Sequence, residues 1–335
     1  MSIAVVLVGC GVFARRYHLP AIDTDGAVRI AMVFDPCPAP DTVALAARHG
    51  APLVDTLDKI PSAAELKASA DEAVCAIVTT PHTLHVGHVA TIIDRGMHVL
   101  VDKPFVMYAE EAINLSRRAQ AAGLVNGVAY NRRFDKNCVR ARELLRQWAI
   151  GTPRYVQTVQ LGYERAGWFL VPSLGGGGPY TGRASHMADL LPWLLDRMPT
   201  RLRSRLRSSS PERSDHGGFI ELQFDELECQ MTCIEEGWHT WDELRIFGDK
   251  GLIELRRPID APIGWSLNCL THGMTEALTC DADATPGDAT RDFFAAVRGH
   301  APVSCSFEQA VPSVRIVELA FASANEGGLW LSLAV

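Results

Sequence analysis

The chain lacks a long apolar run and an excess of basic residues. Its first apolar run, Ile3–Val8, is far too short to cross a bilayer, and it has neither the basic n-region nor the cleavage site of a signal peptide. The formal net charge of −7 gives no general affinity for nucleic acid or for an anionic membrane. We therefore expect neither nucleic acid nor a membrane among its partners.

The sequence also lacks a disulfide or metal-binding framework. Its nine cysteines are scattered, and the odd number would leave one unpaired, so we expect reduced thiols and a cytoplasmic protein. His82, His85 and His88 follow one another at three-residue spacing, but zinc requires four converging ligands and no thiol or carboxylate companion is evident nearby. We predict no metal site.

The 335 residues, 47% of them apolar and 21% charged, are typical of a globular protein with two domains, because a single core rarely grows to this size. Up to about residue 125, short apolar runs alternate with amphipathic helical stretches, which is typical of a doubly wound parallel sheet. We predict an α/β domain over residues 1–125. Its expected strands are Ile3–Val8, Ala27–Phe34, Ala73–Thr79, His98–Val101 and Leu124–Ala129.

The pattern changes beyond a helix predicted over residues 135–149. Residues 219–233 alternate between apolar and polar on both sides of a turn at Asp225 and Glu226, and residues 244–255 read as a hairpin around Gly248-Asp249-Lys250-Gly251. Two helices are expected to follow, over 288–298 and 307–325. We predict a second, α+β domain over residues 126–335, with an open-faced, mostly antiparallel sheet.

The most informative motif, Gly9-Cys10-Gly11-Val12-Phe13-Ala14, follows the first strand. In a dinucleotide-binding turn the first glycine allows a tight turn, the second lets the backbone approach the pyrophosphate, and a small third residue lets helix and strand pack closely. Asp35 ends the next apolar run, at about the distance where an acid meets the ribose hydroxyls. The alternative is an ordinary glycine-bearing turn. We predict NAD binding by Gly9, Gly11, Val12, Phe13, Ala14 and Asp35, with NADP less favoured.

A second cluster, Asp102-Lys103-Pro104, directly follows the strand at His98–Val101. Ligands of open α/β sheets bind beyond the carboxyl ends of the strands, so Lys103 should point into that crevice. Pro104 fixes the backbone and ends the strand. Lys103 is therefore a candidate active-site residue, and the alternative is an ordinary surface lysine.

Short segments that occur in a fixed order along nearly the whole chain complete the pattern. They are Gly9–Ala14, Thr80-Pro81-His82 with His85, Gly96–Pro104, Tyr130–Phe134, the glycine run before His186, and the hairpin 244–255. Together they resemble the glucose-fructose oxidoreductase, inositol dehydrogenase and rhizopine-catabolism (Gfo/Idh/MocA) family, whose Glu-Lys-Pro signature is varied here to Asp102-Lys103-Pro104.

The resemblance implies a Rossmann domain followed by an open-faced α/β domain. It also implies hydride transfer between a nicotinamide and usually a carbohydrate or cyclitol carbon, with Lys103 in the active site. The cofactor side would be lined by Thr80, Pro81, His82, His85, Asp102 and Lys103. The substrate side would be lined by Lys103, Tyr130, Arg132, Trp168, Tyr180, Arg183, His186 and Asp189.

The chain departs from the family pattern at one point. Where the family typically carries Asp-x-Gly-x-His at the start of a helix, this sequence reads Gly182-Arg183-Ala184-Ser185-His186. His186 can still exchange the proton that accompanies hydride transfer, because the pKa of imidazole lies near operating pH. The ammonium of Lys103 can stabilise a developing alkoxide.

The missing aspartate leaves the neighbours of His186 open to more than one interpretation. Tyr180 or Arg183 could fill part of the space. Asp189 follows His186 by about one helical turn, so it would orient His186 or bind a substrate hydroxyl, or else lie on the helix surface.

Two further groups of side chains have alternative roles. Trp168 and Tyr163 could wall a sugar, or be buried structural aromatics. Four arginines alternate along a predicted strand and therefore share one face of it: Arg201, Arg203, Arg205 and Arg207. This face is exposed to solvent, or it lies in a subunit interface, or it binds a phosphorylated or nucleotide-linked sugar. We expect a homodimer or homotetramer through the open sheet face.

These observations predict an NAD-preferring oxidoreductase that acts on a sugar, a sugar derivative or a cyclitol, with Lys103 and His186 as catalytic residues. One alternative is a reductase of an imine or another non-sugar double bond, which would tolerate loss of the aspartate because no hydroxyl need be deprotonated. Another is a catalytically impaired NAD-binding protein. The presence of both Lys103 and His186 argues against this alternative.

Overall fold

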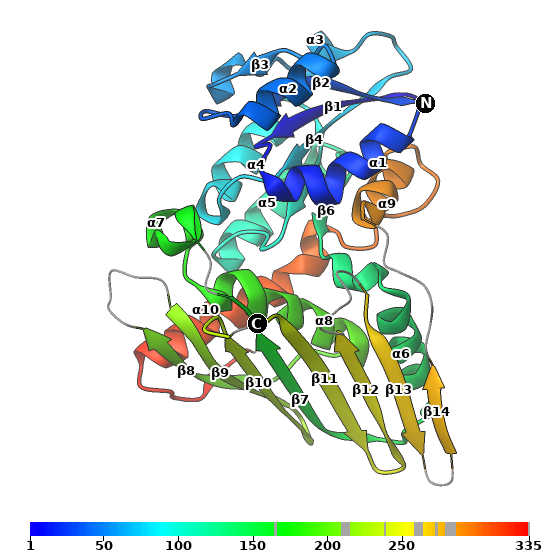
Figure 1. The fold of residues 1–335 in the computed structure, drawn as a ribbon, viewed down its shortest axis with the longest axis vertical. Helices are drawn as coiled ribbons and strands as arrows, with labels where there is room; N and C mark the ends of the chain where they lie inside the picture. Colours follow the sequence, from blue (N-terminus) through cyan, green and yellow to red (C-terminus); the bar gives the residue numbers. More distant parts are fainter. Residues whose placement is uncertain are drawn as a thin grey trace. The chain divides into compact units, whose positions relative to one another are not determined.

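The structure is a computed structural model that describes residues 1–163, 166–208, 215–237, 239–257, 264–271, 274–278 and 286–333. It divides into two compact units, each built on one large sheet (Figure 1). The described residues of Met1–Val106, Glu110–Tyr130 and Thr285–Val311 form the first unit. Those of Met107–Ala109, Asn131–Ala284 and Pro312–Val335 form the second.

The first unit contains a parallel sheet with the strand order β3-β2-β1-β4-β5-β6. All residues of β1 and β4 are buried, as expected for central parallel strands that are covered on both faces. The strand order reverses direction between β1 and β4, and dinucleotides bind at such a switch point. The predicted doubly wound fold is confirmed. The strands are β1 (Ile3–Val8), β2 (Val28–Phe34), β3 (Leu53–Val54), β4 (Ala73–Val78), β5 (His98–Asp102) and β6 (Asn126–Ala129).

A late segment of the chain also belongs to the first unit. Helix α9 (Asp288–Val297) packs against α1, β5 and β6, and His18 Nδ1 lies 2.9 Å from Thr290 Oγ1. The other helical segments of this unit are η1 (Ala14–His18), α1 (Leu19–Thr24), α2 (Pro40–Arg48), η2 (Leu57–Lys59), α3 (Ala63–Leu66), η3 (His82–Leu84), α4 (His85–Asp94) and most of α5 (Ala109–Ala121).

The second unit contains a sheet whose described strands follow the order β14-β13-β12-β11-β7-β10-β9-β8-β15. Its described pairings are antiparallel except that between β7 and β10, so the predicted mostly antiparallel sheet is confirmed. The strands are β7 (Pro153–Leu161), β8 (Arg201–Ser208), β9 (Asp215–Phe224), β10 (Leu227–Ile234), β11 (Trp241–Gly248), β12 (Gly251–Arg257), β13 (Ser266–Thr271), β14 (Met274–Leu278) and β15 (Leu331–Ser332).

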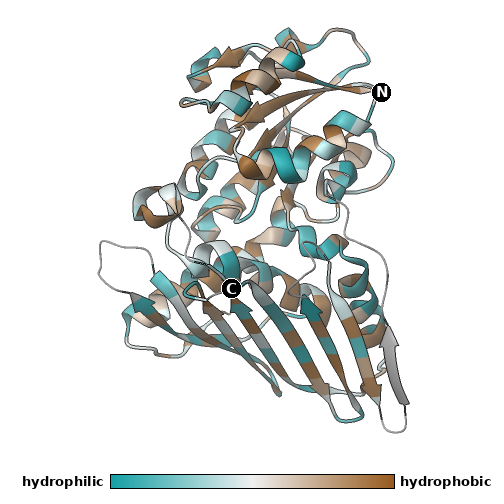
Figure 2. Ribbon diagram, viewed as in Figure 1, coloured by the Kyte–Doolittle hydropathy of each residue, from teal (hydrophilic) through white to brown (hydrophobic). Residues whose placement is uncertain are grey.

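One face of this second sheet packs against helices. Residues from α6, α8 and α10 join the inward side chains of the strands in one apolar core. Hydrophobic and hydrophilic residues alternate along β7, β11 and β12 in Figure 2, because successive side chains point to opposite faces. The helical segments are η4 (Asn131–Phe134), α6 (Lys136–Arg146), η5 (Gly167–Leu170), α7 (Pro172–Gly175), η6 (Tyr180–Ala184), α8 (Ser185–Leu195) and α10 (Phe307–Asn325), which begins in the first unit.

Among the described helices, we find none long and apolar enough to cross a membrane.

Candidate active site

The glycine turn after β1 has the geometry of a ligand-facing turn. Gly9 has a φ of +85°, and a Cβ atom there would lie 2.8 Å from Thr80 Cγ2, so a larger residue would be both strained and crowded. A Cβ atom at Gly11 would meet no described atom within 4 Å. Ala14 is buried, whereas Val12 is 65% exposed and Phe13 is also exposed. The turn therefore packs tightly at Gly9 and Ala14 and leaves Gly11 to Phe13 accessible to a ligand.

The helix that follows this turn begins with a π-helical segment, η1, rather than with regular α-helix. Such segments often occur at functional sites. Arg15 in this segment donates from Nη1 to the carbonyl of Cys10 at 3.0 Å and lies 3.5 Å from Asp41. A cation therefore lies against the turn, although Pro36, Cys37 and Pro38 provide none.

Asp35 lies beside the turn, as the spacing in the sequence requires. Its Oδ2 accepts a hydrogen bond from the amide of Cys10 at 3.4 Å, and its Oδ1 accepts one from the amide of Cys37 at 3.1 Å. A carboxylate at the end of β2 next to the glycine turn fits the ribose of a bound dinucleotide.

His85 joins the loop after β4 to the loop after β5. Its Nε2 lies 2.8 Å from the carbonyl oxygen of Thr80, and its Nδ1 lies 2.8 Å from that of Pro104. Burial lowers the pKa of His85, although these carbonyls oppose the shift. The structure thus places His85 against the loop that carries Lys103, and its predicted place on the cofactor side stays a prediction. Pro81 precedes η3, and His82 is buried within it.

Lys103 is 7% exposed, so the alternative of an ordinary surface lysine is wrong. Its amide donates to Asp102 Oδ1 at 2.8 Å, and its Nζ lies 5.8 Å from the ring centre of Phe13. The side chain therefore lies at the carboxyl end of β5 and close to the glycine turn, and its role in the active site stays a prediction.

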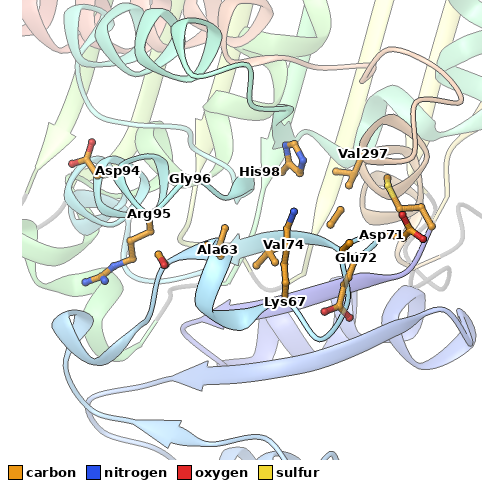
Figure 3. A pocket seen from close by; sticks show the side chains of 15 residues that line it. Ala63, Lys67, Asp71, Glu72, Val74, Asp94, Arg95, Gly96, His98 and Val297 are labelled. Atoms are coloured by element: carbon orange, nitrogen blue, oxygen red, sulfur yellow. The ribbon is translucent and has the colours of Figure 1, made fainter.

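A pocket of about 1060 Å³ lies at the opposite edge of the parallel sheet, near the amino ends of β4 and β5 (Figure 3). Lys67 points toward His98 there, and the predicted site residues do not line it. Ligands of such sheets bind at the carboxyl ends, so we place the candidate site at Gly9, Asp35 and Lys103 rather than in this pocket.

In the second unit, Arg132 and Asp242 form a buried ion pair. Arg132 Nη2 lies 3.2 Å from Asp242 Oδ2, and its guanidinium carbon lies 5.0 Å from the ring centre of Trp265. Gln160 donates to the other carboxylate oxygen of Asp242 at 3.2 Å. Burial by itself would raise the pKa of Asp242, but Arg132, Arg183 and Arg257 outweigh it and hold that pKa below its ordinary value.

Asp189 is 3% exposed, so the alternative of a helix-surface aspartate is wrong. Both of its oxygens accept hydrogen bonds from Arg133, at 2.9 Å from Nε and 2.6 Å from Nη2. This bidentate pair ties α8 to η4. Arg133 thus contacts both carboxylate oxygens of Asp189. The predicted role of Asp189 toward His186 or a substrate hydroxyl stays a prediction.

The segment that departs from the family pattern forms a second π-helical stretch, η6, directly before α8. Tyr180 is part of the apolar core, and its hydroxyl donates to the carbonyl of Arg205 at 3.3 Å. The Tyr180 side chain is thus fully buried in the second unit. Arg183 and His186 are partly exposed, and Nε of Arg183 lies 3.2 Å from Oε1 of Glu235.

The remaining predicted residues differ in their exposure. Tyr130 is buried at the end of β6. Trp168 stacks on Phe169 with ring centres 3.7 Å apart, and both are partly exposed. The four arginines of β8 are exposed on one face, where Arg203 pairs with Glu221.

Among the residues that the structure describes, no group of three or more His, Cys, Asp or Glu side chains is placed to hold a metal ion.

Sequence reasoning missed Glu235, Asp242 and Gln160. Each lies on a strand of the second sheet or directly after one, far along the chain from the partner that it contacts, and no local motif marks it. Arg133 belongs to the Tyr130–Phe134 segment, but no local motif marks its pairing with Asp189.

The chain combines a Rossmann unit, which has a glycine turn beside an acidic residue, with a second unit that has a mostly antiparallel sheet. This combination is typical of a nicotinamide-dependent oxidoreductase with a separate second domain. The model "Oxidoreductase family, NAD-binding Rossmann fold" matches residues 3–130, and the model "GFO/IDH/MocA C-terminal domain" matches residues 138–254. The chain belongs to the GFO/IDH/MocA oxidoreductase family.

Known relatives cover nearly the whole chain. The Rhizopine catabolism protein MocA of Rhizobium meliloti is 27% identical over 329 residues, which are 94% of this chain and 92% of that protein. The aldose-aldose oxidoreductase of Caulobacter crescentus, solved with glycerol, is 19% identical with a TM-score of 0.83, over 99% of this chain and 100% of that one. The WlbA dehydrogenase of Bordetella pertussis, solved with NADH and UDP-GlcNAcA, is 18% identical with a TM-score of 0.82, over 100% of both chains.

Proposed function

We propose that the protein is an NAD-preferring oxidoreductase that transfers a hydride between nicotinamide and a carbon of a sugar, a sugar derivative or a cyclitol. The observation that carries this proposal is the position of Asp35 beside the glycine turn, with Lys103 at the end of β5 close to the same turn. Relatives named for inositols and aldoses, and a neighbour solved with the sugar nucleotide UDP-GlcNAcA, support the substrate class.

The described residues fit a bound dinucleotide. The turn is open at Gly11, where a pyrophosphate would approach the backbone, and a carboxylate stands where the adenosine ribose would lie. NAD, when bound, supplies the nicotinamide that accepts or donates the hydride.

We assign two catalytic roles to side chains of the chain. The ammonium of Lys103 stabilises negative charge on the substrate oxygen, and its burial strengthens that interaction. The imidazole of His186 takes up or delivers the hydroxyl proton. His85 and Asp102 are positioning residues. His85 contacts the carbonyl oxygen of Pro104, and Asp102 accepts a hydrogen bond from the amide of Lys103, so the backbone is held on both sides of the lysine.

Asp35 makes the cofactor preference testable. Its carboxylate accepts hydrogen bonds from ribose hydroxyls but repels a 2′-phosphate, so NAD should bind at least about tenfold more tightly than NADP, on the order of 1.4 kcal/mol. Fluorescence titration with NADH and NADPH measures this ratio. Asp35→Ser should reduce the preference, because Arg15 remains at the turn. Asp55→Ser removes an exposed carboxylate of the same unit and should leave the ratio unchanged. Equal affinities in the wild type would remove Asp35 from this role.

The substrate class is tested by a panel of sugars, inositols and cyclic imines assayed with the wild type and with His186→Ala. We expect turnover of at least one sugar or cyclitol, and a loss of about a hundredfold in kcat for His186→Ala. The loss should be accompanied by a flatter pH profile near neutrality, because imidazole titrates there. Turnover of imines alone, unaffected by His186→Ala, would replace the proposal by an imine reductase.

We also propose that the chain assembles into a homodimer or homotetramer through the open face of the second sheet. The boundary between its domains is proposed near residue 125, close to Tyr130, where a segment of the first unit ends. The assembly proposal rests on the partly exposed apolar side chains of that sheet face.

A further inference from the structure

The stretch from Thr181 to Leu191 has two partly exposed side chains, Arg183 and His186, and its other residues are buried. Both side chains are therefore accessible to a ligand on the exposed side of this stretch. The neighbouring position, Gly182, contributes no charge of its own.

Contacts on two sides fix Arg183 in place. Glu235, which directly follows β10 and is buried, lies 3.2 Å from Nε of Arg183. Gly162 directly follows β7, and a Cβ atom at that position would overlap the guanidinium. Strands β7 and β10 are parallel neighbours, so both contacts come from the same end of the sheet (Figure 1). The guanidinium is thus preorganised before any ligand arrives.

The fixed guanidinium retains unused hydrogen-bonding capacity. Glu235 engages the Nε side, and in the part of the chain that the structure describes the two terminal nitrogens of Arg183 donate no hydrogen bond. The side chain is 14% exposed, and neither terminal nitrogen belongs to the described polar atoms that are buried without a hydrogen-bond partner, so both have access to solvent. The Nη1–Nη2 edge of a guanidinium matches the two oxygens of a carboxylate in a bidentate pair.

Further charged groups of the second unit lie near Arg183. Arg132 and Arg183 both act on the buried Asp242, and Nη1 of Arg132 is buried without a hydrogen-bond partner among the described residues. Charges interact more strongly in a poorly solvated region than in water, and the carboxylates of Asp242 and Glu235 balance part of this positive charge. A carboxylate matches the single guanidinium edge with its two oxygens.

We propose that Arg183 is a specificity-determining residue that binds a carboxylate of the substrate, and that the preferred substrates are therefore acidic sugars or cyclitol acids rather than neutral ones. This inference rests on the proposed function, since it assumes a sugar-like substrate at His186. Glu235 is a positioning residue that holds the guanidinium through Nε.

Matched pairs of ligands test the proposal by binding, independently of turnover. D-glucose is compared with D-glucuronate, and D-galactose with D-galacturonate, by calorimetry on the NADH-bound protein. D-glucose 6-phosphate is the third arm. The wild type should bind at least one acid more than tenfold more tightly than its neutral partner and more tightly than the phosphate. Failure of every acid to bind, or a preference for the neutral sugar or the phosphate, would overturn the proposal.

Variants separate recognition from structure. Arg183→Gln should remove the preference for the acid by weakening its binding at least tenfold, and leave binding of the neutral partner within about twofold. Arg183→Lys should retain part of the preference, because it keeps the charge but not the two-nitrogen edge. Arg154→Gln removes an exposed arginine of the same unit and should change nothing. Equal losses for acid and neutral sugar in Arg183→Gln would mark Arg183 as merely structural and contradict the assignment.

Kinetics distinguishes this inference from the proposed function. If a sugar acid is turned over, Arg183→Gln should raise its KM and leave kcat nearly unchanged, whereas His186→Ala should lower kcat. Selective binding of acids without turnover of any sugar or cyclitol would support the carboxylate site and refute the proposed reaction. Turnover of neutral sugars, with no selectivity for acids, would support the reaction and refute the site.

Discussion

A buried ammonium is costly unless its charge is used, and Lys103 is buried at the carboxyl end of a parallel strand. The ring centre of Phe13, in the glycine turn, lies 5.8 Å from its Nζ. The position therefore favours a catalytic role over a purely structural one.

Lys103→Met tests this role at the scale of one residue. Methionine preserves much of the volume and removes the charge, so turnover should fall about a hundredfold or more while NADH affinity stays within about threefold of the wild type. Steady-state kinetics and NADH fluorescence measure the two quantities. Lys59→Met, which removes an exposed lysine paired with Asp55, is the matched control. A parallel loss of cofactor binding would make Lys103 a structural residue, and unchanged turnover would exclude it from catalysis.

For single residues, the sequence predicted the place of a side chain in the fold more reliably than the residues that it contacts. Asp35 and Lys103 could be located because each directly follows a strand of recognisable pattern, and strand ends of a parallel sheet share one edge. The partners of Asp189 and Arg183 could not be found, because Arg133 and Glu235 lie more than fifty residues away along the chain. Burial of Tyr180 likewise depends on the packing of α10 against η6 rather than on its own neighbours.

At the scale of elements, the start of α6 depends on one buried carboxylate. Asp135 Oδ1 accepts from the amides of Asn137 and Cys138 at 2.9 and 3.0 Å, and Oδ2 accepts from the amide of Trp265 at 3.1 Å. The side chain thus caps the helix and also joins it to the segment before β13.

Asp135→Ala should destabilise the second unit by about 2–4 kcal/mol, because it leaves three amides without their acceptor. All seven tryptophans belong to the ranges of this unit, so urea unfolding followed by tryptophan fluorescence reports on it. Asp135→Asn, which keeps one acceptor oxygen, should lose less. Glu143→Ala removes an exposed carboxylate of the same helix and should cost less than about 0.5 kcal/mol. A loss no larger than that of the control would show that water replaces the cap.

Long elements with a clear period were predictable, and elements defined by their neighbours were not. Strand β1 and helix α10 have the predicted bounds, since continuous burial and helical periodicity both mark them. Strand β3 has two residues, too few for any pattern. Strand β7 lies between β11 and β10, and it was not predicted because its inward positions include Thr158 and Gln160, which look like surface residues in the sequence.

For the whole molecule, the open face of the second sheet has a composition suited to a second copy of the chain. Phe219 is 45% exposed there, and Tyr155 and Phe247 contact each other with ring centres 6.0 Å apart. Charged residues of this face are already paired, as in Arg203 with Glu221 and Arg245 with Glu254. Their burial between two copies would leave few charges unbalanced.

We expect the protein in solution to have at least twice the 36.6 kDa mass of one chain, because a self-complementary face closes a dimer by twofold symmetry. Phe219→Glu should shift the mass toward the monomer, since each copy would bury an unpaired charge in the interface. Val139→Glu introduces the same charge at an exposed apolar position on α6 and should leave the mass unchanged. Sedimentation equilibrium measures all three proteins, and NADH binding by each variant verifies that the first unit is folded. A monomeric wild type, or an oligomer that Phe219→Glu does not weaken, would show that this sheet face is not the interface.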